Sequence, residues 1–182
     1  MTKIVVLSST DRPDSNCDKV ARYVTRRYQE IEGVEAQFIS LQNYPTADVA
    51  GGKYGNKPES VLKFNQPFLE ADGIVFVVPE YNGSFPGILK LFIDYLPFPD
   101  ALKDRAVAYI GEASGYFGGL RAVEQLQMVA AYRYAAQFQE RVFIPAVHKD
   151  FDEETGIKDE FKQGLLEAQT RNFVKFVRAL KG

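Results

Sequence analysis

Apolar runs and helical patterns alternate along the chain, and each kind occurs five times. The run from Ile74 to Val78 is unbroken and rich in β-branched residues, which is typical of a strand covered by helices on both faces. After it, apolar residues recur at helical spacing, at Ile88, Leu91, Phe92 and Tyr95. Strands are predicted at about 3–8, 34–41, 72–78, 105–111 and 140–145. Helices are predicted at about 16–32, 59–70, 87–96, 119–138 and 158–181.

Five βα units in series predict an α/β fold with a doubly wound parallel sheet and helices on both faces. Each crossover is expected to be right-handed, so the strand order must reverse near the middle of the sheet. At that reversal the loops diverge and leave a crevice at the carboxyl ends of the strands. Functional residues are therefore expected in the loops that follow the first, third and fourth strands.

The loop after the third strand, Pro79 to Gly87, is the most informative of the three. It holds a carboxylate, a phenol and a carboxamide at Glu80, Tyr81 and Asn82, followed by Gly83. Hydrophobic burial alone does not require so polar and permissive a segment between a buried strand and a helix. The loop is predicted to contact a ligand.

The loop after the first strand, Ser8 to Cys17, is dense in hydroxyl groups and opens a helix. Unpaired N–H groups at a helix N-terminus and neutral hydroxyl donors can bind a phosphate. Ser15 or Asn16 could equally well only cap the helix, and the residues of this loop do not decide between the two roles. Neither a dinucleotide fingerprint nor a P-loop is present.

The loop after the fourth strand, Glu112 to Gly119, contains three glycines and two aromatic residues. Its backbone could approach a flat ligand closely, with Ser114 bonding the ligand's heteroatoms, or its aromatic residues could simply pack on their neighbours. Together the three loops suit a ligand with a phosphate at one end and a planar heteroaromatic ring at the other. Flavin mononucleotide (FMN) is the commonest cofactor of this kind.

Composition narrows the remaining possibilities. The 182 residues are 46% hydrophobic and 25% charged, which predicts one globular domain over 1–182. The net charge of −2 comes from interspersed signs, so no nucleic-acid partner is expected. The chain contains one cysteine, Cys17, and one histidine, His148, so we expect neither an internal disulfide nor a metal site. The apolar runs are too short for a signal peptide or a membrane span, so we expect a cytoplasmic protein without a membrane partner.

Three motifs, in order along most of the chain, resemble those of the NADPH-dependent FMN reductase family, which includes flavin, quinone, azo-dye and chromate reductases. The most specific is the family's flavin-ring motif Pro-Glu-Tyr-Asn-Gly-Ser-x-Pro-Gly-x-Leu-Lys, matched by Pro79 to Gly87 with Leu89 and Lys90. The phosphate motif is matched loosely by Ser8, Ser9, Arg12, Ser15, Asn16 and Cys17. The third motif is matched by Ser114, Gly115, Gly118, Gly119, Arg121, Ala122, Gln125 and Leu126.

The resemblance implies a flavodoxin-like fold with strand order 2-1-3-4-5 and bound FMN. It implies hydride transfer from NADPH or NADH to FMN and then to a small acceptor, such as a quinone, a flavin, an azo compound or an oxyanion. It also implies a homodimer or tetramer, with Phe92, Tyr95 and Phe98 either in the interface or in the core. The residues expected to bind the cofactor are Ser9, Thr10, Arg12, Ser15, Asn16, Cys17, Pro79, Glu80, Tyr81, Asn82, Gly83, Ser114, Gly115 and Tyr116.

The chain departs from the family pattern in the phosphate loop, where Asp11 is an additional residue and Cys17 stands where a hydroxyl residue is common. Glu80 is expected to orient the ring rather than to act as a base, and no side chain is assigned a catalytic role. Two alternatives stay open. The chain could be an FMN-binding electron carrier or binding module without NAD(P)H oxidation, or a protein-interaction scaffold that has lost its flavin site.

Overall fold

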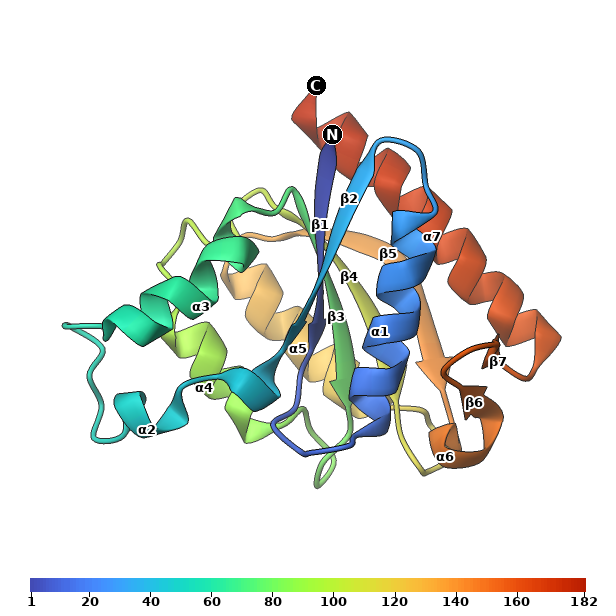
Figure 1. The fold of residues 1–182 in the computed structure, drawn as a ribbon, viewed down its shortest axis with the longest axis horizontal. Coiled ribbons are helices and arrows are strands. Elements are labelled where there is room, and N and C mark those ends of the chain that lie inside the picture. The colour runs from blue at the N-terminus through green and yellow to red at the C-terminus, as the bar shows by residue number, and fades with distance from the viewer.

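The computed structural model describes residues 1–182 and contains a parallel sheet of five strands in the order β2-β1-β3-β4-β5. This is the doubly wound, flavodoxin-like order that the sequence predicts. All neighbouring strands pair in parallel, and their carboxyl ends lie at the lower edge of the sheet in Figure 1. The strands are β1 (Thr2–Ser8), β2 (Val34–Ser40), β3 (Gly73–Pro79), β4 (Ala106–Glu112) and β5 (Ala136–Ile144).

Helices cover both faces of the sheet. Two of them pack on one face and three on the other (Figure 1), and each face has its own hydrophobic core. The first face carries α1 (Asn16–Gln29) and α7 (Glu160–Lys181). The second carries α3 (Glu59–Glu70), α4 (Gly87–Tyr95) and α5 (Leu120–Tyr132).

The central strands β3 and β4 are buried along their whole length. In β3, Ile74 and Phe76 belong to the core under α3, α4 and α5, whereas Val75 and Val77 belong to the core under α1 and α7. Alternate residues of a strand point to opposite faces, so a strand with two cores needs an unbroken apolar run. This explains the pattern seen in the sequence.

The prediction for the end of α5 is wrong. The helix ends at Tyr132 instead of continuing to about 138, and β5 begins at Ala136. Tyr134 takes a left-handed backbone conformation with φ of 60°, which ends the helix. The sequence misleads because β5 is an edge strand whose first residues are half exposed, so its apolar pattern is weak.

Short elements complete the fold. A 3₁₀ turn η1 (Leu41–Asn43) and α2 (Thr46–Val49) follow β2, and α6 (Val147–Asp150) follows β5. A small antiparallel hairpin, β6 (Phe151–Asp152) and β7 (Gly156–Ile157), leads into α7. None of the helices is long and apolar enough to cross a membrane.

The three aromatic residues considered for an interface divide between core and surface. Phe92 and Tyr95 are fully buried, whereas Phe98 is 55% exposed.

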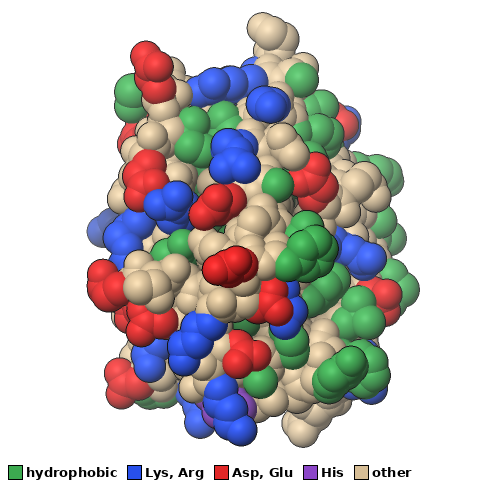
Figure 2. All heavy atoms as spheres, turned by 90° about the vertical axis from the view of Figure 1, so that its right-hand side faces the viewer, with side chains coloured by type: hydrophobic (Ala, Val, Ile, Leu, Met, Phe, Trp, Pro, Cys, Tyr) green, Lys and Arg blue, Asp and Glu red, His purple; other side chains and the backbone are tan.

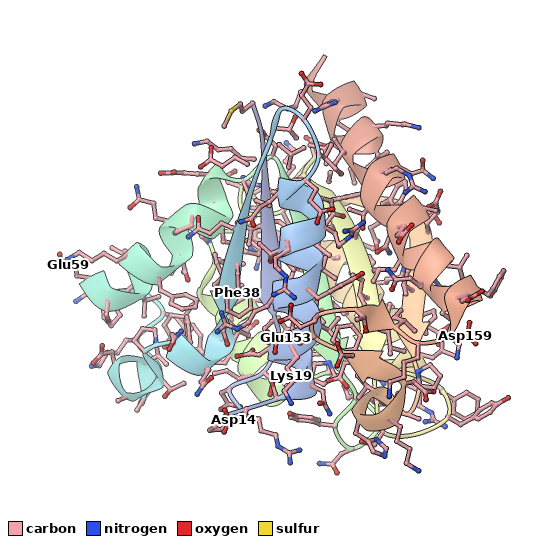
Figure 3. All side chains as sticks on the ribbon, turned by 45° about the vertical axis from the view of Figure 1, so that its right-hand side comes forward. Asp14, Lys19, Phe38, Glu59, Glu153 and Asp159 are labelled. Atoms are coloured by element: carbon pink, nitrogen blue, oxygen red, sulfur yellow. The ribbon has the colours of Figure 1, made fainter.

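On the side of the molecule where α7 lies, acidic and basic side chains are interspersed (Figure 2). On α1, the guanidinium of Arg22 lies 4.2 Å from the ring centroid of Phe38, a residue labelled in Figure 3.

Gly73 offers a test of how α7 packs on the sheet. A Cβ atom at this position would lie 2.7 Å from Cγ2 of Val177, so Gly73→Ala is expected to lower the free energy of unfolding by about 1–3 kcal/mol. Gly164, in the exposed part of α7, has nothing within 4 Å of the same position, so Gly164→Ala should raise stability by about 0.5–1 kcal/mol. Urea unfolding measures both changes, and equal effects would contradict this packing.

Candidate functional site

A pocket of about 810 Å³ opens at the carboxyl edge of the sheet, between the loops that follow β1, β3 and β4 and the short helix α6. The structure thus brings together the three loops that the sequence singles out. The expected residues that line the pocket are Arg12, Ser15, Asn16, Pro79, Glu80, Tyr81, Asn82, Gly83, Ser114, Gly115 and Tyr116. Ser9, Thr10 and Cys17 are completely buried and do not line it.

One end of the pocket is formed by the N-terminus of α1. Ser15 caps this helix, because its hydroxyl accepts a hydrogen bond from the backbone N–H of Asp18 at 3.0 Å. Ser15 and Asn16 also line the pocket, so the cap and the pocket wall coincide. The first-turn N–H groups of a helix lack partners within the helix and favour an anion. Arg12, exposed on the same wall, adds positive charge.

Two acidic residues belong to the same loop. Asp14, labelled in Figure 3 below the start of α1, lines the pocket and takes a left-handed backbone conformation with φ of 51°. Asp11, the additional residue of this loop, is exposed and does not line the pocket. The charge of Asp11 therefore lies outside the pocket wall.

The buried residues of the loop after β1 form hydrogen bonds with neighbouring strands and with the loop after β3. The Cys17 thiol donates to the carbonyl oxygen of Val77 at 3.1 Å and accepts from the Ser8 hydroxyl at 3.2 Å. Burial raises the pKa of the Cys17 thiol well above its ordinary value, so this thiol is not a reactive nucleophile. The hydroxyl groups of Thr10 and Tyr81 are 2.9 Å apart, and this contact ties the first loop to the loop after β3.

The loop after β3 contains a tight turn. Tyr81 and Ser84 exchange two backbone hydrogen bonds, of 2.8 and 3.0 Å, around Asn82 and Gly83. Both central residues have positive φ, of 52° and 76°, which is the conformation that an Asn-Gly pair adopts most readily. From α5, Gln125 accepts from the Ser84 hydroxyl at 2.6 Å and donates to the carbonyl oxygen of Gly83 at 2.9 Å. The turn is thereby fixed to the helix.

Glu80 forms an ion pair and is therefore not a free base. Its Oε1 accepts from Nη1 of Arg121 at 2.9 Å, and its side chain is only 12% exposed. Its Oε2 is buried without a hydrogen-bond partner. The guanidinium of Arg121 also lies 5.0 Å from the ring centroid of Phe117. The pair connects the loop after β3 with the first turn of α5.

Two glycines let the loop after β4 pack tightly against the sheet. Gly118 and Gly119 both have positive φ, and a Cβ atom at Gly119 would lie 2.7 Å from the backbone nitrogen of Glu112. Because the backbone is held this closely, the neighbouring aromatic rings project outward: Tyr116 is 88% exposed. The rings of Tyr116 and Phe117 meet edge to face, with centroids 5.7 Å apart. The rim of the pocket therefore offers aromatic surface to a planar ligand.

The pocket wall also includes residues that the sequence analysis does not assign to cofactor binding. They are Pro13, Asp14, Glu112, Ala113, Phe117, Gly118, Arg121 and His148. His148 reaches the wall because Ala146 takes a left-handed conformation with φ of 47° and turns the chain into α6, which residue types alone do not reveal. Glu112 could have been found, since it is a charged residue at the carboxyl end of an apolar strand. Burial raises the pKa of its carboxyl to about 7, against the opposing charge of Arg12.

These features define a doubly wound α/β protein with a polar pocket at its topological switch point, suited to a ligand that carries both an anion and a planar ring. The model of the NADPH-dependent FMN reductase family matches residues 2–149. The chain belongs to this family. The match confirms the family that the three motifs resemble, and with it the expected class, an oxidoreductase that uses FMN and NAD(P)H.

Known proteins similar to this chain agree with that assignment. A quinone reductase of Escherichia coli is 30% identical over 183 residues, which span 98% of this chain and 97% of the relative. An NAD(P)H-dependent FMN reductase of Pseudomonas aeruginosa is 26% identical over 170 residues, which span 88% of this chain and 90% of the relative. The solved flavoenzyme NAD(P)H:acceptor oxidoreductase of Paracoccus denitrificans has a TM-score of 0.78 at 21% identity, covers 98% of both chains, and supports the fold alone.

The residues present fit FMN. The hydroxyl of Ser9, in the loop after β1, is buried without a partner, and Ser15 and Asn16 at the N-terminus of α1 line the pocket. At the other end, the Asn82-Gly83 turn and the glycines after β4 line the pocket beside the exposed ring of Tyr116.

Gln125 tests whether α5 holds the turn after β3. Gln125→Ala removes one accepted and one donated hydrogen bond, so the free energy of unfolding should fall by about 1–3 kcal/mol. Glu124→Ala, an exposed change on the same helix, should alter it by less than about 0.5 kcal/mol. Urea unfolding of the two variants measures the difference. A Gln125 variant as stable as the Glu124 variant would show that the turn holds itself.

Proposed function

We propose that this chain binds FMN in the pocket at the carboxyl edge of the sheet and passes hydride equivalents from NADPH or NADH to a small acceptor. The observation that carries the proposal is the convergence of three loops on one pocket, with the N-terminus of α1 at one end and the Asn82-Gly83 turn at the other. A phosphate and a flavin ring need these two environments, and the family supplies the expectation that they are used for FMN.

Each loop has a distinct task in this proposal. The first-turn N–H groups of α1, with Ser15, Asn16 and Arg12, bind the phosphate, while the buried Ser9, Thr10 and Cys17 shape the loop from below. The ring lies between the two remaining loops, whose proposed contacts are Pro79, Glu80, Tyr81, Asn82, Gly83, Ser114, Gly115 and Tyr116.

The flavin supplies the hydride-accepting chemistry when it is bound, and the chain supplies position and environment. Gln125 holds the Asn82-Gly83 turn, and the close packing of Gly119 holds the loop after β4. Because both segments are held rigidly, the flavin ring would be oriented without reorganisation of the pocket. Glu80 is engaged with Arg121 and therefore orients its loop instead of moving a proton. No side chain of the pocket is assigned a covalent role.

The acceptor is proposed to be a quinone, a flavin, an azo compound or an oxyanion. Relatives named as a quinone reductase and as an NADPH azoreductase, the latter from a Bacillus species and 27% identical over 147 residues, support small acceptors of this kind. An electron carrier is the alternative, and the near-neutral net charge of −2 argues against it, because strong charge is what guides a carrier to its protein partners.

The purified protein is expected to bind FMN and to oxidise NADPH or NADH in the presence of a quinone, a flavin, an azo dye or chromate. Steady-state oxidation with each nucleotide and each acceptor separates an oxidoreductase from a carrier, since a carrier would bind FMN without turnover. A protein that binds no added FMN and oxidises neither nucleotide would refute the proposal.

Asn82→Gly sharpens the same experiment. Glycine keeps the positive φ of the turn and removes only the carboxamide, so a lost hydrogen bond to the ring should weaken FMN binding by roughly 5–10-fold without unfolding the turn. Glu124→Ala is the matched control and should bind FMN as the wild type does. Unchanged binding in Asn82→Gly would mean that the carboxamide does not contact the flavin.

We further propose that the chain forms a homodimer or tetramer in the cytoplasm. An aromatic cluster on the α4 and α5 face supports assembly: the exposed ring of Phe98 lies 5.8 Å from that of Tyr132 and 6.4 Å from that of Tyr134. Contiguous exposed aromatic surface favours a protein interface, here with a second copy of the chain. The free, buried Cys17 suits a reducing compartment.

Sedimentation velocity at micromolar concentration should therefore show a dimer or tetramer. Tyr132→Asp, which places a charge in the cluster, is expected to shift the population toward monomer. Phe161→Asp changes an exposed aromatic residue on α7, across the sheet, and should leave the assembly unchanged. A wild-type protein that sediments only as a monomer would overturn the proposal.

A further inference from the structure

Glu112 is a buried carboxyl group on the wall of the pocket. It is the last residue of β4 and is only 6% exposed, yet it lines the pocket. It forms neither a hydrogen bond nor an ion pair through its side chain: the interactions that affect its ionisation are burial and the more distant charge of Arg12. A carboxylate held this way is costly unless a partner arrives or a proton binds.

The side chain of Glu112 faces α1. Residues of β4 alternate between the two cores, and Ala108 and Ile110, which share a face with Glu112, pack in the core beneath α1 and α7. Gly111, on the opposite face, packs against the backbone of Gly118. The charge of Glu112 also acts on the Cys17 thiol in the first turn of α1. The carboxyl group therefore lies toward the end of the pocket where a phosphate is expected.

The surroundings of Glu112 hold few charges that could neutralise it. Arg12 is the cation whose charge acts on it, and the guanidinium of Arg121 is already paired with Glu80. The titratable and charged groups on the pocket wall and directly beneath it are Arg12, Asp14, Cys17, Asp18, Glu80, Tyr81, Tyr116, Arg121 and His148. A second negative charge placed at the α1 end would repel the Glu112 carboxylate, because the Glu112 side chain is buried and has no partner that neutralises it.

We propose that Glu112 controls FMN retention through its protonation state: the neutral carboxyl donates a hydrogen bond to the phosphate, and the carboxylate repels it. This inference rests on the proposed flavin site and adds a control that the three motifs do not contain. The chain would hold its flavin tightly in mildly acidic to neutral solution and release it in alkaline solution. Protonation of Glu112 would therefore control whether the phosphate of FMN stays bound.

The sign follows from proton linkage. Burial raises the pKa of the Glu112 carboxyl to about 7, so the free protein carries a neutral group below that pH and a charged one above it. If only the neutral form accepts the phosphate, the dissociation constant should rise by about tenfold between pH 7.0 and pH 8.5. The phosphate itself is mainly a dianion throughout this range, since its second pKa is about 6.

The experiment is a fluorescence titration of the apoprotein with FMN at pH 7.0 and pH 8.5, which measures binding without turnover. The wild type should bind about tenfold more weakly at pH 8.5. Glu112→Gln keeps the size and a hydrogen-bond donor but cannot ionise, so it should bind with similar affinity at both values and more tightly than the wild type at pH 8.5. Riboflavin, which lacks the phosphate, should show no such dependence with either protein.

His148→Gln is the matched control, because histidine is the other side chain on this wall whose charge ordinarily changes near neutral pH. It should keep the wild-type ratio between the two pH values. A Glu112→Gln variant that keeps this ratio, a wild type with no pH dependence, or riboflavin that follows FMN would each overturn the inference while leaving the flavin site intact. Absence of FMN binding in every variant at both pH values would instead refute the proposed function, and the inference with it.

Discussion

The parallel pairing of β3 with β4 at the centre of the sheet is the constraint on which the site depends. Both strands are buried along their whole length, and their register aligns Pro79 with Glu112 at the carboxyl edge. Because the two hydrophobic cores pack on these strands from opposite faces, the first residues of the loops that follow them have fixed positions. The backbone hydrogen bond from Glu80 to the carbonyl oxygen of Glu112, at 3.2 Å, carries this alignment into the pocket wall.

From those fixed points the loops are further stabilised by contacts with one another and with α5. Gln125 of α5 holds the turn after β3, and the contact between Thr10 and Tyr81 joins that turn to the loop after β1. The Glu80–Arg121 pair joins the loop after β3 to the first turn of α5. Mutual support of this kind gives a polar pocket a defined shape although few of its residues belong to regular structure.

Much of this arrangement could be predicted from the sequence, because parallel strands with two cores produce unbroken apolar runs, and because Asn82-Gly83 favours one turn geometry. The predicted strand order and family are confirmed, and most expected ligand residues meet in the pocket. The sequence does not reveal the start of β5, because an edge strand buries one side only. It also does not reveal that Ser9, Thr10 and Cys17 are buried behind the pocket wall, because this depends on the path of the loop, which residue types do not fix.

The position of Cys17 has a consequence for durability. The only thiol of the chain is completely buried beneath the pocket and donates its proton to the carbonyl oxygen of Val77 in β3. A protein that repeatedly transfers electrons through a bound cofactor is exposed to the oxidants that this transfer produces. Here the only thiol is enclosed and held protonated, so it is protected from oxidation although it lies directly behind the pocket.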